Sequence, residues 1–403
     1  MKRTLASVIL LGLSLLPVAP ASAQFTETLP KNTFMLDVAY GYSRLRNAYD
    51  NNGKKIELID RVDRYDPGGG LQGTIVPKGL ATYDILILQL RYGITDYLSL
   101  AVGIPIVLRT SVNPDLQWIE GDYQWPLGRR YSADDFWQWA ESMGQPKPGK
   151  WEGNKGVLSD IVFGARYRFS DHISKLKKLG LGLSLTAYYA APTGKKKDPE
   201  LLVAGGTTSW ELHFQGDLGF HLSIDKTFLS IDKRITIGLD LFYQVMLPHT
   251  FDTPRGTVNP LLLRYEPYAG PTYKIDPGDF MGASLGAHFV IYKGPAKKNW
   301  ISKSAERAKN LPGILAFRFT YSFTYIGQTD YTSESTLWDW SNEKIWRPGY
   351  KNTLTFTLIA SLLRVGAPLQ VYFRYRSLSL IPGKNCRSAD VLTVGIRIPA
   401  KFW

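Results

Sequence analysis

Two side chains in this sequence have the spacing of a base and a nucleophile, because His221 and Ser223 are separated by one residue. In nucleophilic hydrolysis a histidine accepts the serine proton, and a third group holds the histidine in place. No such third group is evident near the pair, so we predict that the chain is not an enzyme. The sequence also contains no metal-ligand cluster, phosphate-binding loop or nucleotide-binding motif. We therefore expect neither a cofactor nor a metal site.

Charged and histidine side chains alternate with apolar side chains in many segments. Because such groups need water or an oppositely charged partner, we expect them to line a shared interior. The candidates are Arg91, Arg109, Arg166, Arg168, Glu211, His213, Asp217, Asp240, His288, Arg318, Arg374 and Arg376. A surplus of arginine could steer anionic solutes. The alternative is a network of cross-strand ion pairs that fills a narrow interior.

The segment from Trp210 to Asp225 has the clearest alternation. Its even positions are almost all large and apolar, whereas its odd positions are polar, charged or glycine. A period of two is typical of a strand with one face in hydrocarbon and the other in water. Strands of soluble proteins average about five or six residues, whereas a tilted strand that crosses a bilayer needs about nine to eleven. The length of this segment therefore predicts a transmembrane strand.

The whole chain contains about twelve such segments, an even number as in bacterial barrels. The long connections between them, at 47–80, 110–156, 192–208, 249–278 and 328–351, alternate with shorter ones, as extracellular loops alternate with periplasmic turns. We therefore predict an all-β fold: a transmembrane antiparallel up-and-down β-barrel of about 12 strands, within a range of 10–14. The segments run approximately over residues 31–46, 81–92, 98–109, 157–169, 179–191, 209–225, 234–248, 279–292, 313–327, 352–364, 368–381 and 389–402. Two connections depart from the pattern, since 293–312 is long and includes a helical stretch near 302–309, and 382–388 is short.

The first residues have the features of an export signal. Lys2 and Arg3 precede an apolar stretch, and Ala21-Ser22-Ala23 matches the small-residue pattern that signal peptidase cleaves. We predict a signal peptide over residues 1–23 and a single barrel domain over 24–403, located in the cell outer membrane of a Gram-negative bacterium. After residue 24 no run of about 18 apolar residues occurs, which excludes ordinary transmembrane helices.

The predicted outer loops are rich in tryptophan. Eight of the 11 tryptophans fall in 110–156 and 328–351: Trp118, Trp125, Trp137, Trp139, Trp151, Trp338, Trp340 and Trp346. In the first loop Ser132–Met143 predicts a short helix, with Ser132 as its cap and Asp135 in its first turn. The clustered indoles could stack on aromatic or sugar ligands and gate the barrel. The alternative is a hydrophobic mini-core that keeps a long loop folded across the pore.

Much of the positive charge falls in three predicted periplasmic turns. Eleven basic residues there, among them Lys175, Lys177, Lys178 and Lys226, face only three acidic ones. Anionic phospholipid explains this excess, and we predict no nucleic-acid binding. The single Cys386 cannot form an intramolecular disulfide.

The chain ends on Phe402-Trp403, an aromatic end of the kind that the assembly machinery of outer-membrane barrels reads. Leu392, Val394, Ile396 and Ile398 share the parity of Phe402 and not of Trp403. Either Pro399 introduces a bulge or Phe402 faces the lipid. Outer-membrane lipid and lipopolysaccharide are the other expected partners.

Three stretches carry a resemblance to a known family. Tyr92–Val107 (YGITDYLSLAVGIPIV), Gly156–Phe169 (GVLSDIVFGARYRF) and Tyr188–Lys197 (YYAAPTGKKK) resemble the outer-membrane β-barrel transporters named after the meta-pathway of phenol degradation. The resemblance implies passive uptake of small organic compounds, often hydrophobic or aromatic, and carries over no residue roles. The chain departs from that family in its large Trp-rich loops. The alternative is a closed structural or surface-binding barrel without transport.

Overall fold

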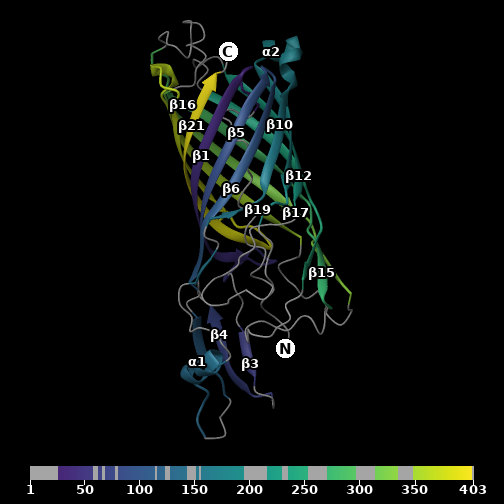
Figure 1. The fold of residues 1–403 in the computed structure, drawn as a ribbon, viewed down its shortest axis with the longest axis vertical. Coiled ribbons are helices and arrows are strands. Elements are labelled where there is room, and N and C mark those ends of the chain that lie inside the picture. The colour runs from purple at the N-terminus through teal and green to yellow at the C-terminus, as the bar shows by residue number, and fades with distance from the viewer. Residues whose placement is uncertain are drawn as a thin grey trace.

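Twelve strands of the described residues close into one antiparallel barrel (Figure 1). The computed structural model describes residues 26–57, 62–65, 69–77, 80–113, 116–122, 128–142, 151–153, 156–194, 216–228, 235–252, 270–295, 314–334 and 348–401. The barrel strands are β1 (Thr33–Tyr49), β5 (Leu80–Thr95), β6 (Leu98–Asn113), β10 (Ile161–Arg168), β11 (Leu181–Ala191), β12 (Asp217–Phe228), β13 (Ile235–Met246), β16 (Phe280–Tyr292), β17 (Leu315–Ile326), β19 (Gly349–Ser361), β20 (Gln370–Ser377) and β21 (Cys386–Lys401). The predicted fold class and strand number are confirmed.

The barrel closes because each strand pairs with the next barrel strand along the chain, and the last pairs with the first. Leu36 of β1 lies opposite Ile398 of β21 on one side and Leu90 of β5 on the other. A closed ring leaves no strand edge unpaired, which a bilayer requires. None of the described helices is long and apolar enough to cross a membrane.

The strand alternation has the predicted facing. In β12, Leu218, Phe220 and Leu222 are exposed on the outer surface. Asp217 and Ser223, at the odd positions just before and just after them, are buried on the lumen side. The predicted facing is thus confirmed for residues 217–225. Of the earlier part of that segment, residues 209–215 lie outside the described residues.

The final strand is regular up to its described end. Its pairing with β1 runs from Cys386 to Lys401, and the single register shift falls between Leu45 and Asn47. No bulge therefore occurs at Pro399. Phe402 and Trp403 lie outside the described residues, as does the predicted helical stretch at 302–309.

Two small sheets extend beyond one end of the barrel, at the bottom of Figure 1. The first contains β3 (Val62–Tyr65), β4 (Leu71–Pro77) and β7 (Leu116–Glu120), with helix α1 (Ala133–Ser142) beside it. The second contains β14 (His249–Asp252), β15 (Thr272–Asp276) and β18 (Asp330–Ser333). Since outer loops are long and periplasmic turns short, this end is extracellular and the end with α2 (Ser174–Lys178) is periplasmic.

Candidate solute pathway through the barrel

One group of charged side chains surrounds Asp37 on the lumen side of β1. Arg397 Nε donates to Asp37 Oδ2 at 2.7 Å, and the Tyr372 hydroxyl donates to Asp37 Oδ1 at 2.9 Å. An Arg91 guanidinium nitrogen lies 3.8 Å from the same carboxylate. Arg397 and Arg374 lie over the Tyr372 ring, 4.4 and 5.3 Å from its centroid. One carboxylate and one aromatic ring therefore hold three arginines in the wall, which leaves this region positively charged.

The positive region continues across the lumen. Arg318 interacts electrostatically with Arg397, Arg374, Arg166 and Glu27. Arg166 also donates from Nε to Thr186 Oγ1 at 2.8 Å. Charges on β10, β17, β20 and β21 therefore share one interior, which is the arrangement expected of a polar, hydrated barrel lumen.

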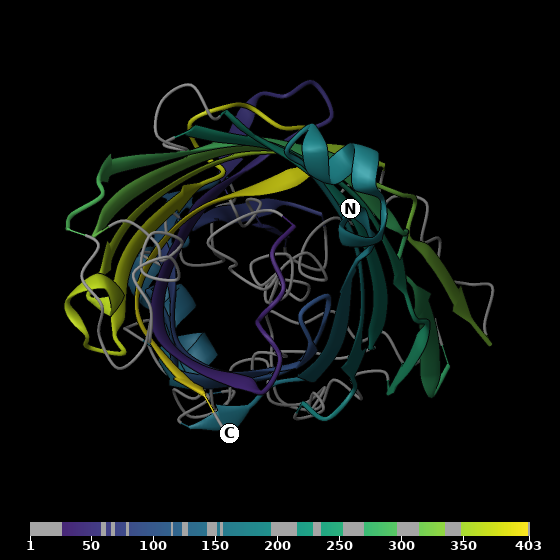
Figure 2. The ribbon, with the colours of Figure 1, turned by 90° about the horizontal axis from the view of Figure 1, so that it is seen from above.

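The chain segment before β1 lies inside the barrel. We call residues Thr26–Asn32 the N-terminal strap, which crosses the interior of the ring in Figure 2. Its start is held by Asp225 of β12, whose Oδ2 accepts from the Thr26 amide at 3.0 Å and from the Thr26 hydroxyl at 2.8 Å. Further along, the Leu29 amide donates to Ser99 Oγ of β6 at 2.7 Å. The strap thus links β12 to β6, which are separated by β10 and β11 in the wall, near the periplasmic end.

The carboxylate of Glu27 brings the strap into contact with the positive region. It interacts electrostatically with Arg168, Arg318 and Arg166, and with the like charge of Asp225. Arg166 Nη1 also donates to the Glu27 carbonyl oxygen at 3.4 Å. The arginines therefore offset part of the free-energy cost of burying the Glu27 carboxylate in the lumen.

Two glycines of the wall make room for the strap. A Cβ on Gly182 of β11 would lie 2.2 Å from Thr26 Oγ1, and one on Gly93 of β5 would lie 2.2 Å from the Pro30 carbonyl oxygen. Both separations are too short for any side chain to be tolerated without movement of the strap or the wall.

A second polar group joins the His-x-Ser pair to Asp240. His221 Nδ1 lies 2.7 Å from Asp240 Oδ2, and the Ser223 hydroxyl donates to Asp240 Oδ1 at 2.6 Å. The third group that the sequence did not reveal is therefore present, on the neighbouring strand β13. The Ser223 proton points at the carboxylate and not at the histidine ring, so the pair is not arranged as nucleophile and base. Among the described residues, no three potential ligands gather to hold a metal ion.

Arg109 lies on the outer surface of the barrel, although the alternation predicts that it faces the lumen. Asp84 pairs with Arg109 and Ile85 pairs with Val107, so Leu108 is an extra residue that shifts the parity of β6. Arg109 binds Asp84 at 2.8 Å, and the outward-facing Tyr40 donates its hydroxyl to the same carboxylate at 2.6 Å. A single bulge thus removes Arg109 from the lumen.

The other candidate lumen residues divide into two sets. The first set faces the lumen and consists of Arg376 on β20, His288 on β16, Asp217 on β12 and Arg168 on β10. Glu211 and His213 lie outside the described residues. Sequence reasoning missed the strap, because nothing in Thr26–Asn32 marks it as different from an exposed leader.

The outer module formed by β3, β4, β7 and α1 has its own core. Trp118 stacks on Phe136 at 4.7 Å between ring centroids, and Trp137 packs against the edge of Phe136 at 4.5 Å. Ile75 and Tyr131 complete the cluster. For Trp118 and Trp137 the described contacts are those of a mini-core. The structure does not describe the side chains of Trp139 and Trp151. The other candidates lie outside the described residues: Trp125, Trp338 and Trp340.

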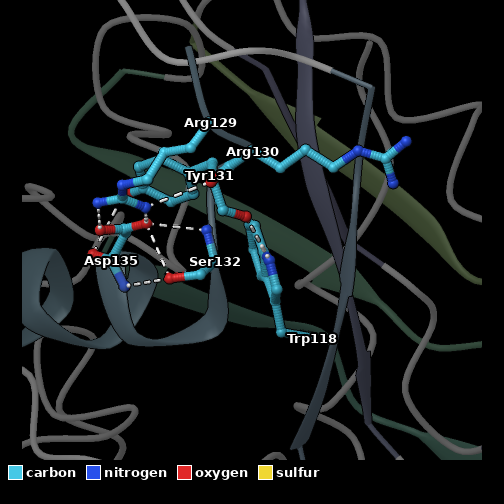
Figure 3. Close-up of polar contacts among 6 residues, drawn as sticks. All are labelled: Trp118, Arg129, Arg130, Tyr131, Ser132 and Asp135. Atoms are coloured by element: carbon cyan, nitrogen blue, oxygen red, sulfur yellow. Dashed lines mark hydrogen bonds and ion pairs between the residues drawn. The ribbon is translucent and has the colours of Figure 1, made fainter. Parts of the chain in front are cut away.

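The predicted cap of the helix is present (Figure 3). Asp135 Oδ2 accepts from the Ser132 amide at 2.9 Å, while the Asp135 amide donates to Ser132 Oγ at 3.3 Å. Arg129 forms a bidentate ion pair with Asp135. This ion pair, together with the bonds from Ser132, holds the pKa of Asp135 well below its usual range.

No protein-family model matches the chain, and no curated protein matches it in sequence. Among solved structures it is similar to the COG4313 outer membrane channel from Pseudomonas putida F1, with 13% identity over 93% of this chain and 97% of that chain and a TM-score of 0.54. The chain also matches the monoaromatic hydrocarbon channel CymD, with 10% identity over 93% of this chain and 89% of that chain and a TM-score of 0.32. It matches a FadL homologue from Pseudomonas aeruginosa with 12% identity over 97% of this chain and 96% of that chain and a TM-score of 0.30. TM-scores this low do not establish a shared fold. The resemblance to the meta-pathway transporters is supported only as an outer-membrane barrel, since no family model confirms that family. The chain has the fold of the Pseudomonas putida outer membrane channel and is a transmembrane β-barrel of the outer-membrane type.

Proposed function

We propose that the protein is an outer-membrane channel through which small organic solutes pass passively. The observation that carries this proposal is the polar interior: arginines, carboxylates and hydroxyl groups from many strands share one lumen inside an apolar outer wall. The resemblance to the meta-pathway transporters favours hydrophobic or aromatic solutes. The surplus of arginine favours solutes that also carry a negative charge.

We infer that the N-terminal strap controls the passage from the periplasmic side. Its hydrogen bonds to Asp225 and Ser99 favour the closed arrangement, and the arginines around Glu27 offset part of the cost of burying its carboxylate. All of these contacts are polar, and individual hydrogen bonds contribute only about 0.5–1.5 kcal/mol each, or about 1.5–3 kcal/mol where one partner is charged. The strap can therefore leave and return without unfolding of the barrel.

Conductance measurements on two glycine variants test this proposal. Gly182→Ala places a methyl group against Thr26 and Asp225, whereas Gly164→Ala in the adjacent strand meets nothing closer than 3.5 Å. In planar bilayers, Gly182→Ala should conduct more than the parent protein, and Gly164→Ala should conduct like it. Equal conductance of all three would show that the strap is not a gate. If neither the parent nor Gly182→Ala conducts any ion or solute, the channel proposal fails.

A closed surface-binding barrel is the second candidate function. The observation that favours it is the outer module, which projects beyond the barrel and leaves Ile119 half exposed. Silence in every conductance measurement, together with binding of an aromatic or sugar ligand to the outer module, would support it.

A further inference from the structure

The turn between β10 and β11 carries positive charge that the channel does not use. It contains the short helix η2 (Phe169–His172) and α2, with Lys175, Lys177 and Lys178 all exposed. Lys226, near the end of β12, is also exposed on the outer side of the barrel. The Thr227 amide donates to the Gly180 carbonyl oxygen at 3.4 Å, so the end of β12 lies beside the end of α2. The four lysines therefore belong to one region of the periplasmic rim.

Aromatic contacts fix this turn against the barrel wall. His172 packs against the edge of Tyr97 at 4.5 Å and stacks on Tyr167 at 5.8 Å. The outward-facing Tyr167 ring is itself 39% exposed. Exposed aromatic rings at this height form the girdle that lies at the membrane–water interface of such barrels. The turn is thus held at the level of the lipid head groups.

Two apolar side chains of the turn are exposed. Ile173, directly before α2, is 44% exposed, and Leu179, directly after it, is 60% exposed. Ile237, on the strand next to Lys226, continues the apolar surface at 42% exposure. Apolar side chains at the edge of the lipid-facing wall are stabilised by acyl chains, while the lysine side chains between them extend to the phosphates.

The lysines of this region are not neutralised by nearby carboxylates, although Lys226 Nζ lies over the Phe228 ring, 5.8 Å from its centroid. The nearby Asp171 carboxylate lies 3.4 Å from Arg168 Nε. Within the part of the chain that the structure describes, none of the four lysines forms an ion pair. A ligand with a phosphate and acyl chains would match both the charge and the apolar rim.

We propose that Ile173–Leu179 and Lys226 form a binding site for an anionic phospholipid of the periplasmic leaflet. Phosphatidylglycerol represents the class, since its head group keeps the negative charge that a zwitterionic lipid neutralises. The occupant is a lipid rather than a protein because the apolar side chains continue the outer wall of the barrel. The site is separate from the lumen and does not depend on the proposed transport.

Lipid retention on the purified full-length protein tests the site. The protein is exchanged into neutral detergent with equal amounts of phosphatidylglycerol and phosphatidylcholine of identical acyl chains, and bound lipid is counted by native mass spectrometry. The variant K175Q/K177Q/K178Q/K226Q removes the four charges. The matched control K54Q/K55Q/R130Q/K274Q removes four exposed charges at the extracellular end. Since each basic residue near an anionic lipid contributes about fivefold, the periplasmic variant should retain less phosphatidylglycerol by on the order of tenfold or more.

The control should retain phosphatidylglycerol like the parent, and phosphatidylcholine should not distinguish the variants. Unchanged retention in the periplasmic variant, or an equal loss in the control, would overturn the proposal. A measurement on the parent protein alone does not depend on the folding of any variant. Its phosphatidylglycerol retention should decrease when the salt concentration is raised from 50 to 500 mM, because the screening length then shortens by about threefold. Retention that is insensitive to salt would also overturn it.

Discussion

A charged residue on the lipid-facing surface of the barrel lowers the stability of the protein, by an amount that depends on its depth in the bilayer. Leu222 lies between Leu185 and Leu241 in the middle of the apolar wall, whereas Leu218 lies one residue from the start of β12 and opposite Tyr189. Leu222→Arg should lower the free energy of unfolding by about 2–4 kcal/mol, and Leu218→Arg by about 1 kcal/mol or less, because the cost of a charge falls toward the interface. Urea titration of the protein in lipid vesicles measures both values. Equal losses in the two variants would contradict the assigned depth of β12.

Charged side chains on the lumen side are stabilised by ion pairs and ring contacts, not by contact with lipid. Asp37 compensates Arg397 and Arg91 at once, and Tyr372 both donates to that carboxylate and supports two guanidinium groups with its ring. The wall can therefore hold several like charges close together. This positive region is what a negatively charged solute would meet.

Helix α1 depends on a cap whose charge state changes in acid. Because Arg129 and Ser132 lower the pKa of Asp135 in the folded module, the carboxylate stabilises the helix at neutral pH. That contribution is complete above the ordinary aspartate pKa of 3.8 and is lost as the pH falls through the lower folded value. We expect backbone hydrogen exchange in residues 128–142, corrected for intrinsic rates, to be faster at acid pH than at neutral pH.

Two variants separate this effect from general acid damage. Asp135→Asn removes the charge, so its exchange at neutral pH should resemble that of the parent in acid and should change little with pH. Asp134→Asn removes an exposed charge one residue earlier and should behave like the parent. Identical protection in all three proteins at neutral pH would mean that the cap does not stabilise α1.

The complete molecule combines a closed barrel, an internal strap and an outer module that has its own core. The free energy of closing a loop depends only weakly on the length of the loop. Replacement of residues 115–150 by a short Gly/Ser linker should therefore leave the barrel strands paired. We expect the shortened protein to keep the β-sheet circular dichroism of the parent and to conduct more in planar bilayers, as a loop that limits entry would require. Conductance equal to that of the parent would exclude the loop as a gate and leave the strap as the proposed control element. Loss of the β-sheet signal would instead show that the module is needed for barrel folding.

Much of this architecture was predictable, because alternation is a local property of the chain. Leu218, Phe220 and Leu222 alternate with polar residues over a length that suits a bilayer, and this pattern repeats often enough to predict twelve strands. The cap of α1 is local too, since Ser132 and Asp135 are three residues apart. Local patterns of this kind do not depend on which strands become neighbours.

The remaining features depend on contacts between distant parts of the chain. Arg109 faces outward because one extra residue in β6 changes its parity, and the pairing with Asp84 reveals that bulge. Asp240 reaches His221 from another strand, and Thr26 meets Asp225 across 199 residues of sequence. The free energy of such contacts is set by the register of neighbouring strands and by the space that Gly93 and Gly182 leave open. Alternation predicts the wall of the barrel, but the contents of its lumen follow only from the closed three-dimensional arrangement.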